Sequence, residues 1–137
     1  MVNMGKNVKR IVVTENYRSF SVSTVDGTSD SVHIDAPGFA NLPNRCDYAV
    51  RVSPTRPKHF FFVELKGNDV VKAARQLVCT IENLSAMYAG YTKKEAWVIS
   101  GGWRPAISTA FQVEGAKAKK YGFDLKYRTR LMQIDLV

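Results

Sequence analysis

HFFFVELKG, residues 59–67, is the stretch from which the fold can be worked out. Its run of Phe and Val contains no proline and ends at a glycine, which is typical of a buried β-strand. Side chains alternate across a strand, so the even-numbered residues share one face: Phe60, Phe62, Glu64 and Lys66. Ionised side chains are rarely buried without partners, so an acid and a base at the end of a core strand indicate a functional site.

The preceding segment, residues 45–53 (RCDYAVRVS), also alternates like a strand, and Pro-Thr-Arg-Pro at 54–57 suits a hairpin turn. A symmetric hairpin places Asp47 opposite Glu64, with Cβ atoms about 4.5–5.5 Å apart. Two carboxylates at that distance repel each other, and a divalent cation between them would reverse the sign of this interaction. The opposite face is expected to be the core face, with the apolar pairs Cys46–Leu65, Tyr48–Val63 and Val50–Phe61. The acids and Lys66 then share the other face.

This arrangement resembles the PD-(D/E)xK nuclease superfamily, which has the restriction-endonuclease-like fold. The matching pieces are Asp47 and the sequence Glu64-Leu65-Lys66 that ends the apolar strand and is followed by a predicted helix; no proline precedes Asp47. The resemblance implies an α/β domain with a central mixed sheet of four or five strands flanked by helices. It also implies that Asp47, Glu64 and the backbone carbonyl of Leu65 hold Mg²⁺, with Mn²⁺ as a substitute. Lys66 is expected to orient or deprotonate the attacking water, or to stabilise charge at the phosphate.

A helix is predicted over about residues 68–89, capped by Asn68 or Asp69. Its apolar stripe recurs every three or four residues: Val70, Ala74, Leu77, Ile81, Leu84 and Tyr88. The resemblance implies a catalytic role for Gln76, because related nucleases use a glutamine on this helix, often in a Gln-x-x-x-Tyr pattern. Here the fourth residue on is Thr80. The alternative is a solvent-exposed helix glutamine.

Two further acids, Asp35 and Glu15, are candidates for an additional metal ligand, with plain surface acids as the alternative. The other predicted elements are a strand over 17–25, a return strand over 31–35 antiparallel to it, a loop over 36–44, a strand over 95–100 parallel to the Glu64 strand, a helix over 106–121 and a last strand over 123–136.

The chain is basic, with 20 Lys and Arg against 12 Asp and Glu and a formal net charge of +8. This favours a polyanionic partner, nucleic acid before membrane. Six cationic residues lie between positions 117 and 130 and are expected to contact phosphates: Lys117, Lys119, Lys120, Lys126, Arg128 and Arg130. The alternative is a charged edge strand that protects against aggregation.

We expect one nuclease-like domain over residues 1–137, with residues 1–10 as a candidate basic arm. The sequence has no apolar membrane span and no visible leader, and its two cysteines suit buried thiols in a reducing cytoplasm of bacterial, archaeal or phage-encoded origin. The expected activity is Mg²⁺-dependent hydrolysis of phosphodiester bonds, with DNA favoured over RNA, by a structure-specific or nonspecific endonuclease. The sequence leaves open whether the protein forms a homodimer. The alternatives are a non-catalytic nucleic-acid-binding module on the same fold and an accessory protein-interaction subunit.

Overall fold

The computed structural model describes residues 9–15, 17–24, 29–34, 45–52, 58–65, 69–101 and 108–136. Its strands are β1 (Lys9–Glu15), β2 (Arg18–Thr24), β3 (Asp30–His33), β4 (Tyr48–Val52), β5 (His59–Glu64), β6 (Lys93–Ser100), β7 (Phe123–Thr129) and β8 (Leu131–Asp135). Its helices are α1 (Val70–Asn83), α2 (Ser85–Tyr88) and α3 (Thr109–Lys119). None of the helices in this described part is long and apolar enough to cross a membrane.

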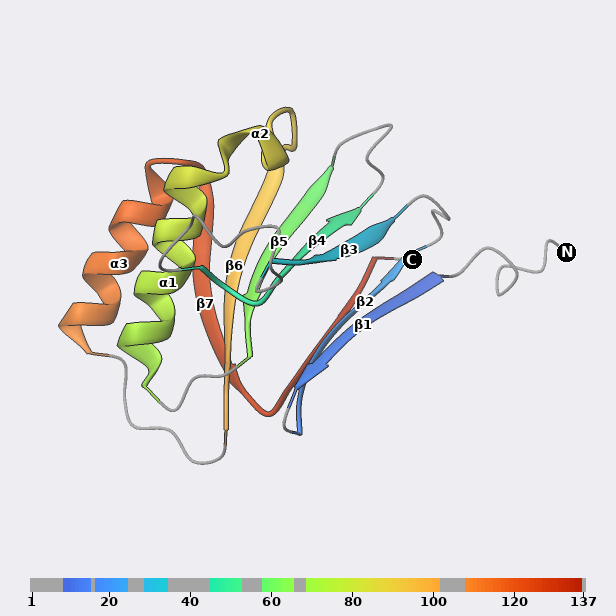
Figure 1. Ribbon diagram of the computed structural model, residues 1–137, viewed down its shortest axis with the longest axis horizontal. Helices are drawn as coiled ribbons and strands as arrows, with labels where there is room; N and C mark the ends of the chain where they lie inside the picture. Colours follow the sequence, from blue (N-terminus) through green and yellow to red (C-terminus); the bar gives the residue numbers. More distant parts are fainter. Residues whose placement is uncertain are drawn as a thin grey trace, which may run out of the picture.

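These strands form two sheets, a five-stranded one in the order β3-β4-β5-β6-β7 and a three-stranded one in the order β1-β2-β8. In Figure 1, α1 and α3 cover one face of the larger sheet and the smaller sheet lies against the other face. The larger sheet is mixed, because β3, β4 and β5 are antiparallel whereas β5, β6 and β7 are parallel. The predicted α/β class with a mixed sheet and packed helices is therefore confirmed, and the second sheet was not predicted.

Both faces of the hairpin strands β4 and β5 are buried. Phe60 and Phe62 pack with α1 and α3 in one core cluster, while Phe61 and Val63 pack with residues of the smaller sheet in the other. Strands buried on both faces are typically near-continuous hydrophobic runs, as β5 is. The expectation of one core face and one separate face for the acids was therefore wrong, because each face is covered by its own layer.

The predicted hairpin register is confirmed from Tyr48, which pairs with Val63, to Val52, which pairs with His59. The predicted Cys46–Leu65 pair is wrong: Cys46 belongs to the helix-side cluster, and Leu65 belongs to the cluster between the sheets. The reason is that the backbone leaves the regular antiparallel pairing with β5 just before β4 begins.

Helix α1 begins as predicted, since the Asp69 side chain accepts a hydrogen bond from the backbone N–H of Lys72 at 3.0 Å. It does not run on to residue 89. Leu84 has φ −119° and ψ 41° and separates α1 from the short helix α2. The hydroxyl of Tyr88 donates to the carbonyl of Ile81 at 2.7 Å and holds α2 against α1.

The C-terminal segment differs from the single predicted strand. Arg130 has φ 62°, and this left-handed residue ends β7 and starts the turn into β8. Strand β8 then joins the smaller sheet parallel to β2. The predicted antiparallel return to the 17–25 strand was also wrong in its partner, because β3 pairs with β4 whereas β2 pairs with β1 and β8.

Candidate functional site

Asp47 is held at the start of β4 by backbone bonds on both sides. Its N–H donates to the carbonyl of Val63 at 3.1 Å, and its carbonyl accepts from the N–H of Ile34 at 2.8 Å. Its side chain is 2% exposed, and Oδ2 accepts a hydrogen bond from the backbone N–H of Leu65 at 2.7 Å. One carboxylate oxygen therefore already ties the start of β4 to the end of β5. A carboxylate has about four lone-pair positions, so this bond does not exhaust what Asp47 can accept.

Glu64 is the last residue of β5 and is also 2% exposed. The Leu65 N–H that bonds to Asp47 Oδ2 belongs to the residue after Glu64, so the two acids are neighbours where β5 ends. The pKa of the Cys46 thiol is affected by both acids. Burial raises the pKa of this thiol well above its usual value, and the negative charges of Glu64 and, to a smaller extent, Asp47 raise it further. Both acids are therefore close enough to Cys46 for their charges to affect its thiol.

Thr80 of α1 is a site residue that the sequence analysis did not single out for its own side chain. It is fully buried, and its Oγ1 accepts a hydrogen bond from the backbone N–H of Cys46 at 2.8 Å. The same hydroxyl donates to the backbone carbonyl of Gln76, also at 2.8 Å. Helical Thr residues often bond back to the carbonyl four positions earlier, and a Thr inside an apolar stripe was the available signal. Thr80 therefore fixes the residue next to Asp47.

Gln76 itself lies on α1 with a half-buried side chain, and its backbone carbonyl accepts the Thr80 hydroxyl. Ser100, the last residue of β6, was not predicted as a site residue. It lies two positions beyond Val98, which pairs with Glu64 and belongs to the helix-side cluster. The side chains of Ser100 and Glu64 are therefore both on the helix side of the sheet. The Ser100 hydroxyl is buried and has no hydrogen-bond partner among the described residues. It adds a polar group at the carboxyl ends of β5 and β6.

The other predicted metal and catalytic residues are only partly brought together. Lys66 and Asp35 lie outside the described residues. Glu15 ends β1 and pairs with Arg18 across the hairpin. Within the described ranges no group of three or more His, Cys, Asp or Glu side chains is arranged to hold a metal ion, so Glu15 does not join Asp47 and Glu64. Mg²⁺ usually takes one or two protein carboxylates and keeps several waters, so the two acids with the Leu65 carbonyl fit this ion.

Five of the six predicted phosphate-contacting cations lie at the two ends of β7, and Lys126 lies in its middle. The three lysines of α3 and its C-terminal cap are near the amino end of β7, whereas Arg128 and Arg130 are near its carboxyl end. A strand rises about 3.3 Å per residue, so the six-residue step from Asp124 to Arg130 spans about 20 Å. The carboxyl end is also the end at which Glu64 and Ser100 lie, since β5, β6 and β7 are parallel.

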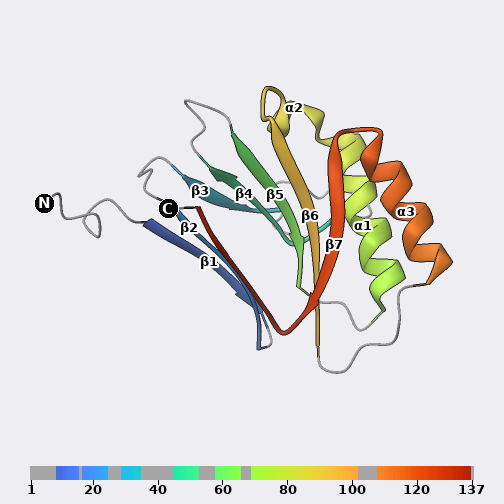
Figure 2. The same cartoon turned by 180° about the vertical axis from the view of Figure 1, so that it is seen from behind.

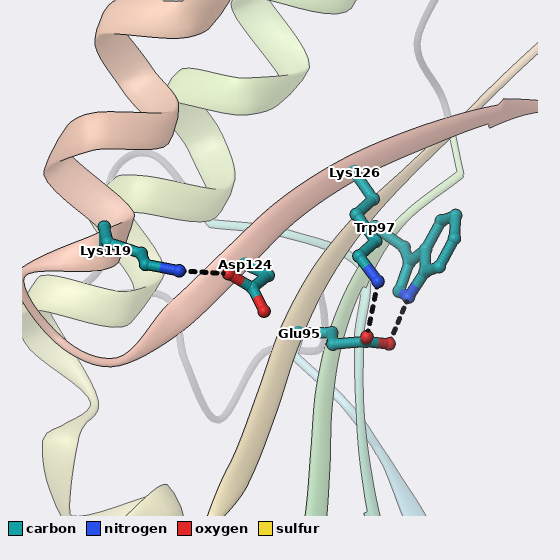
Figure 3. Close-up of polar contacts among 5 residues, drawn as sticks. All are labelled: Glu95, Trp97, Lys119, Asp124 and Lys126. Carbon is teal, nitrogen blue, oxygen red and sulfur yellow. Dashed lines mark hydrogen bonds and ion pairs between the residues drawn. The ribbon is translucent and has the colours of Figure 1, made fainter.

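Three of these six cations are paired with acids. Lys119 contacts Asp124 at 2.7 Å and Lys126 contacts Glu95 at 2.7 Å, as Figure 3 shows. The Glu95 carboxylate also accepts a hydrogen bond from the indole N–H of Trp97 at 3.0 Å. The third pair joins Lys117 to Glu114 at 3.2 Å. Within the described part of the chain, Lys120, Arg128 and Arg130 form no ion pair.

Comparisons of this chain with protein-family models, with curated proteins and with solved structures find no match. The site therefore has to be interpreted from its own chemistry. Two buried carboxylates, the Leu65 backbone carbonyl and the Ser100 hydroxyl lie where β4 begins and where the parallel strands β5 and β6 end, and they are an oxygen-rich set of groups. Such a set suits a hard divalent cation, and the carboxyl ends of strands are where ligands bind in open α/β sheets.

Proposed function

We propose that the protein is a metal-dependent nuclease that hydrolyses phosphodiester bonds in DNA, on a restriction-endonuclease-like fold. The observation that carries the proposal is the pair Asp47 and Glu64, two buried acids on neighbouring strands. Burying two like charges side by side is unfavourable unless a cation or a hydrogen-bond network compensates for it. The hairpin, its two buried acids and the following helix α1 agree with the resemblance drawn from the sequence.

In this proposal Asp47, Glu64 and the Leu65 carbonyl would hold Mg²⁺, and the ion would supply a bound water of lowered pKa and neutralisation of charge on the phosphate. The Leu65 N–H and the Thr80 hydroxyl keep Asp47 in position through the bonds described above. The resemblance implies that Lys66 orients or deprotonates the attacking water, or stabilises charge at the phosphate. The basic chain, at +8, favours the approach of a polyanion.

A second function, a nucleic-acid-binding module without turnover, is favoured by one observation. The bond from the Leu65 N–H to Asp47 Oδ2 gives Asp47 a structural role that needs no metal ion. Variants that keep this bond separate the two functions. In Asp47→Asn the amide oxygen still accepts from Leu65, but the charge that a metal needs is gone.

The test is incubation of a mixed panel of linear, nicked, branched and single-stranded DNA with Mg²⁺, and with a chelator as control. The nuclease proposal predicts cleavage by the wild type that disappears in Asp47→Asn and Glu64→Gln. Glu82→Gln, which changes an exposed acid on α1, is the matched control and should cleave like the wild type. DNA binding without cleavage under all conditions would favour the binding module. Cleavage that survives in Glu64→Gln would contradict the proposed site.

A further inference from the structure

The end of the molecule at which β5, β6 and β7 finish also carries two turns in unusual backbone conformations. Tyr17, between β1 and β2, has φ 63°, and Arg130, between β7 and β8, has φ 62°. These are the non-glycine residues with positive φ in the described part of the chain. In both views of the ribbon the β1–β2 turn, the β7–β8 turn and the end of β6 gather at the bottom (Figures 1 and 2).

Backbone bonds tie these turns together. The N–H of Arg130 donates to the carbonyl of Ser100 at 2.8 Å, and the carbonyl of Arg130 accepts from the N–H of Ser19 at 2.7 Å. The Arg18 guanidinium lies so close to Gly101 that a Cβ there would collide with it. The turn with Tyr17 is therefore fixed against the carboxyl end of β6, beside the strand that ends in Glu64.

Tyr17 is held there at a conformational cost and without any compensating packing. The left-handed region disfavours side chains with a Cβ, and a two-residue hairpin turn prefers glycine at such positions. The Tyr17 side chain is nevertheless fully exposed, so its ring buries no area within this chain. Backbone strain of this kind is characteristic of ligand-binding sites, where a bound molecule supplies the missing contact.

The surroundings of Tyr17 specify the chemistry of that molecule. Arg128 and Arg130 are exposed cations without ion pairs in the described structure, and Leu131 pairs with Ser19 in the β2–β8 ladder and is also exposed. The backbone bonds described above place Tyr17 at the same end of the molecule as Arg128 and Arg130. An exposed aromatic ring and two guanidinium groups without ion pairs at one end match a single nucleic-acid strand, whose bases stack on aromatic rings while its phosphates contact arginines. In an intact duplex the bases are stacked on each other and offer no such face to a protruding ring.

We propose that this end surface, formed by Tyr17, Arg128, Arg130 and Leu131, binds an unpaired nucleotide of the DNA substrate, with Tyr17 stacking on its base. The inference rests on the proposed nuclease function and deepens it by naming the substrate class. The preferred substrate is DNA with an unpaired stretch, such as a single strand, a flap or a frayed end. Gly101 lies three residues beyond Val98, the partner of Glu64, and this corresponds to about 10 Å along the strand.

The test measures fluorescence anisotropy of a labelled 20-mer of thymidine and of a 20-base-pair duplex, with a chelator present so that cleavage does not interfere. Tyr17→Gly should weaken binding to the single strand by about 5- to 100-fold, the effect of losing one stacked base, and leave duplex binding unchanged. Tyr17→Phe, which keeps the ring, should bind like the wild type. Tyr17→Gly should also fold, because glycine suits φ 63°.

The double variant Arg128→Ala/Arg130→Ala should reduce the salt dependence of single-strand binding by about 1.4 in the log–log slope, because each phosphate that is no longer neutralised removes about 0.7. Lys58→Ala/Lys93→Ala, at the amino ends of β5 and β6, is the control with the same loss of charge and should keep more of the slope. Equal affinity of Tyr17→Gly and wild type for the single strand would overturn the inference while leaving the nuclease proposal intact. A wild type that binds neither DNA would overturn both.

Discussion

The Asp47 side chain stabilises the fold through a hydrogen bond that needs no metal ion. Its Oδ2 accepts the N–H of Leu65 at the point where β5 ends, and both groups are buried. A buried N–H that loses its acceptor costs about 1–3 kcal/mol. The charge of Asp47 and its role as an acceptor can therefore be separated by substitution, because Asn keeps the acceptor and Ala does not.

We expect Asp47→Ala to lower the free energy of unfolding by about 1–3 kcal/mol, since it leaves the Leu65 N–H without its partner. Asp47→Asn should be the more stable of the two variants. Urea denaturation followed by circular dichroism measures both. Equal stability of the two variants would show that the Leu65 bond contributes nothing to the fold.

His59, at the start of β5, should make the stability of the protein depend on pH. Burial and the positive charge of Lys93 lower the pKa of His59 from its usual 6.5. The unfolded chain therefore binds the proton more readily than the folded chain, and stability is lost as the pH falls below about 6.5. We expect His59→Gln to show a smaller loss of unfolding free energy between about pH 7.5 and 5 than the wild type. His33→Gln, which removes the other histidine, should keep the steeper loss.

At the scale of elements, the hydroxyl of Thr80 connects α1 to the start of β4. Because it bonds to the Cys46 N–H, the position of α1 determines where Asp47 lies. We expect Thr80→Val, which keeps the shape and removes the hydroxyl, to lower the unfolding free energy by about 1–3 kcal/mol. Divalent-metal affinity should fall as well, which a purely structural bond far from the acids would not cause. Thr80→Ser, which restores the hydroxyl, should recover most of both properties.

The features that depend on residues close together in the sequence could be predicted from the local pattern of apolar, polar and turn residues. The register of β4 and β5 followed from alternation and the prolines of the turn, and the cap of α1 at Asp69 followed from the residue type. The break at Leu84 could not be predicted, because the apolar spacing continues unbroken to Tyr88. The departure of Cys46 from the ladder depends on its bond to Thr80, 34 residues away, which no local pattern contains.

At the scale of the whole molecule, the two sheets share a core that the sequence did not reveal. Strand β2 pairs with β8 although more than a hundred residues separate them, and such nonlocal pairing has no local signal. A strand was predicted over residues 17–25, where β2 lies, but its partners β1 and β8 were not predicted. The closeness of Asp47 and Glu64 could be predicted because both belong to one hairpin, whereas their binding of a metal ion stays a prediction.

Phe20 of β2 should be essential to the contact between the sheets. It is fully buried, and its ring centroid lies 5.4 Å from that of Phe61 and 6.2 Å from that of Trp97, both in the larger sheet. We expect Phe20→Ala to lower the free energy of unfolding by about 3–5 kcal/mol through the lost burial and the cavity. Phe20→Leu should cost clearly less. Similar losses in the two variants would show that this contact does not join the sheets tightly.

The central claim is that Asp47 and Glu64 hold a divalent metal ion, and calorimetric titration of Mg²⁺ and Mn²⁺ tests it most directly. We predict that the wild type and Glu82→Gln bind the ion, whereas Asp47→Asn and Glu64→Gln bind it at least about tenfold more weakly, as expected when one carboxylate ligand is neutralised. All four proteins should be folded by circular dichroism at the temperature used. Absence of binding by the wild type, or equal binding by wild type and Glu64→Gln, would contradict the account and leave the two acids with a structural role.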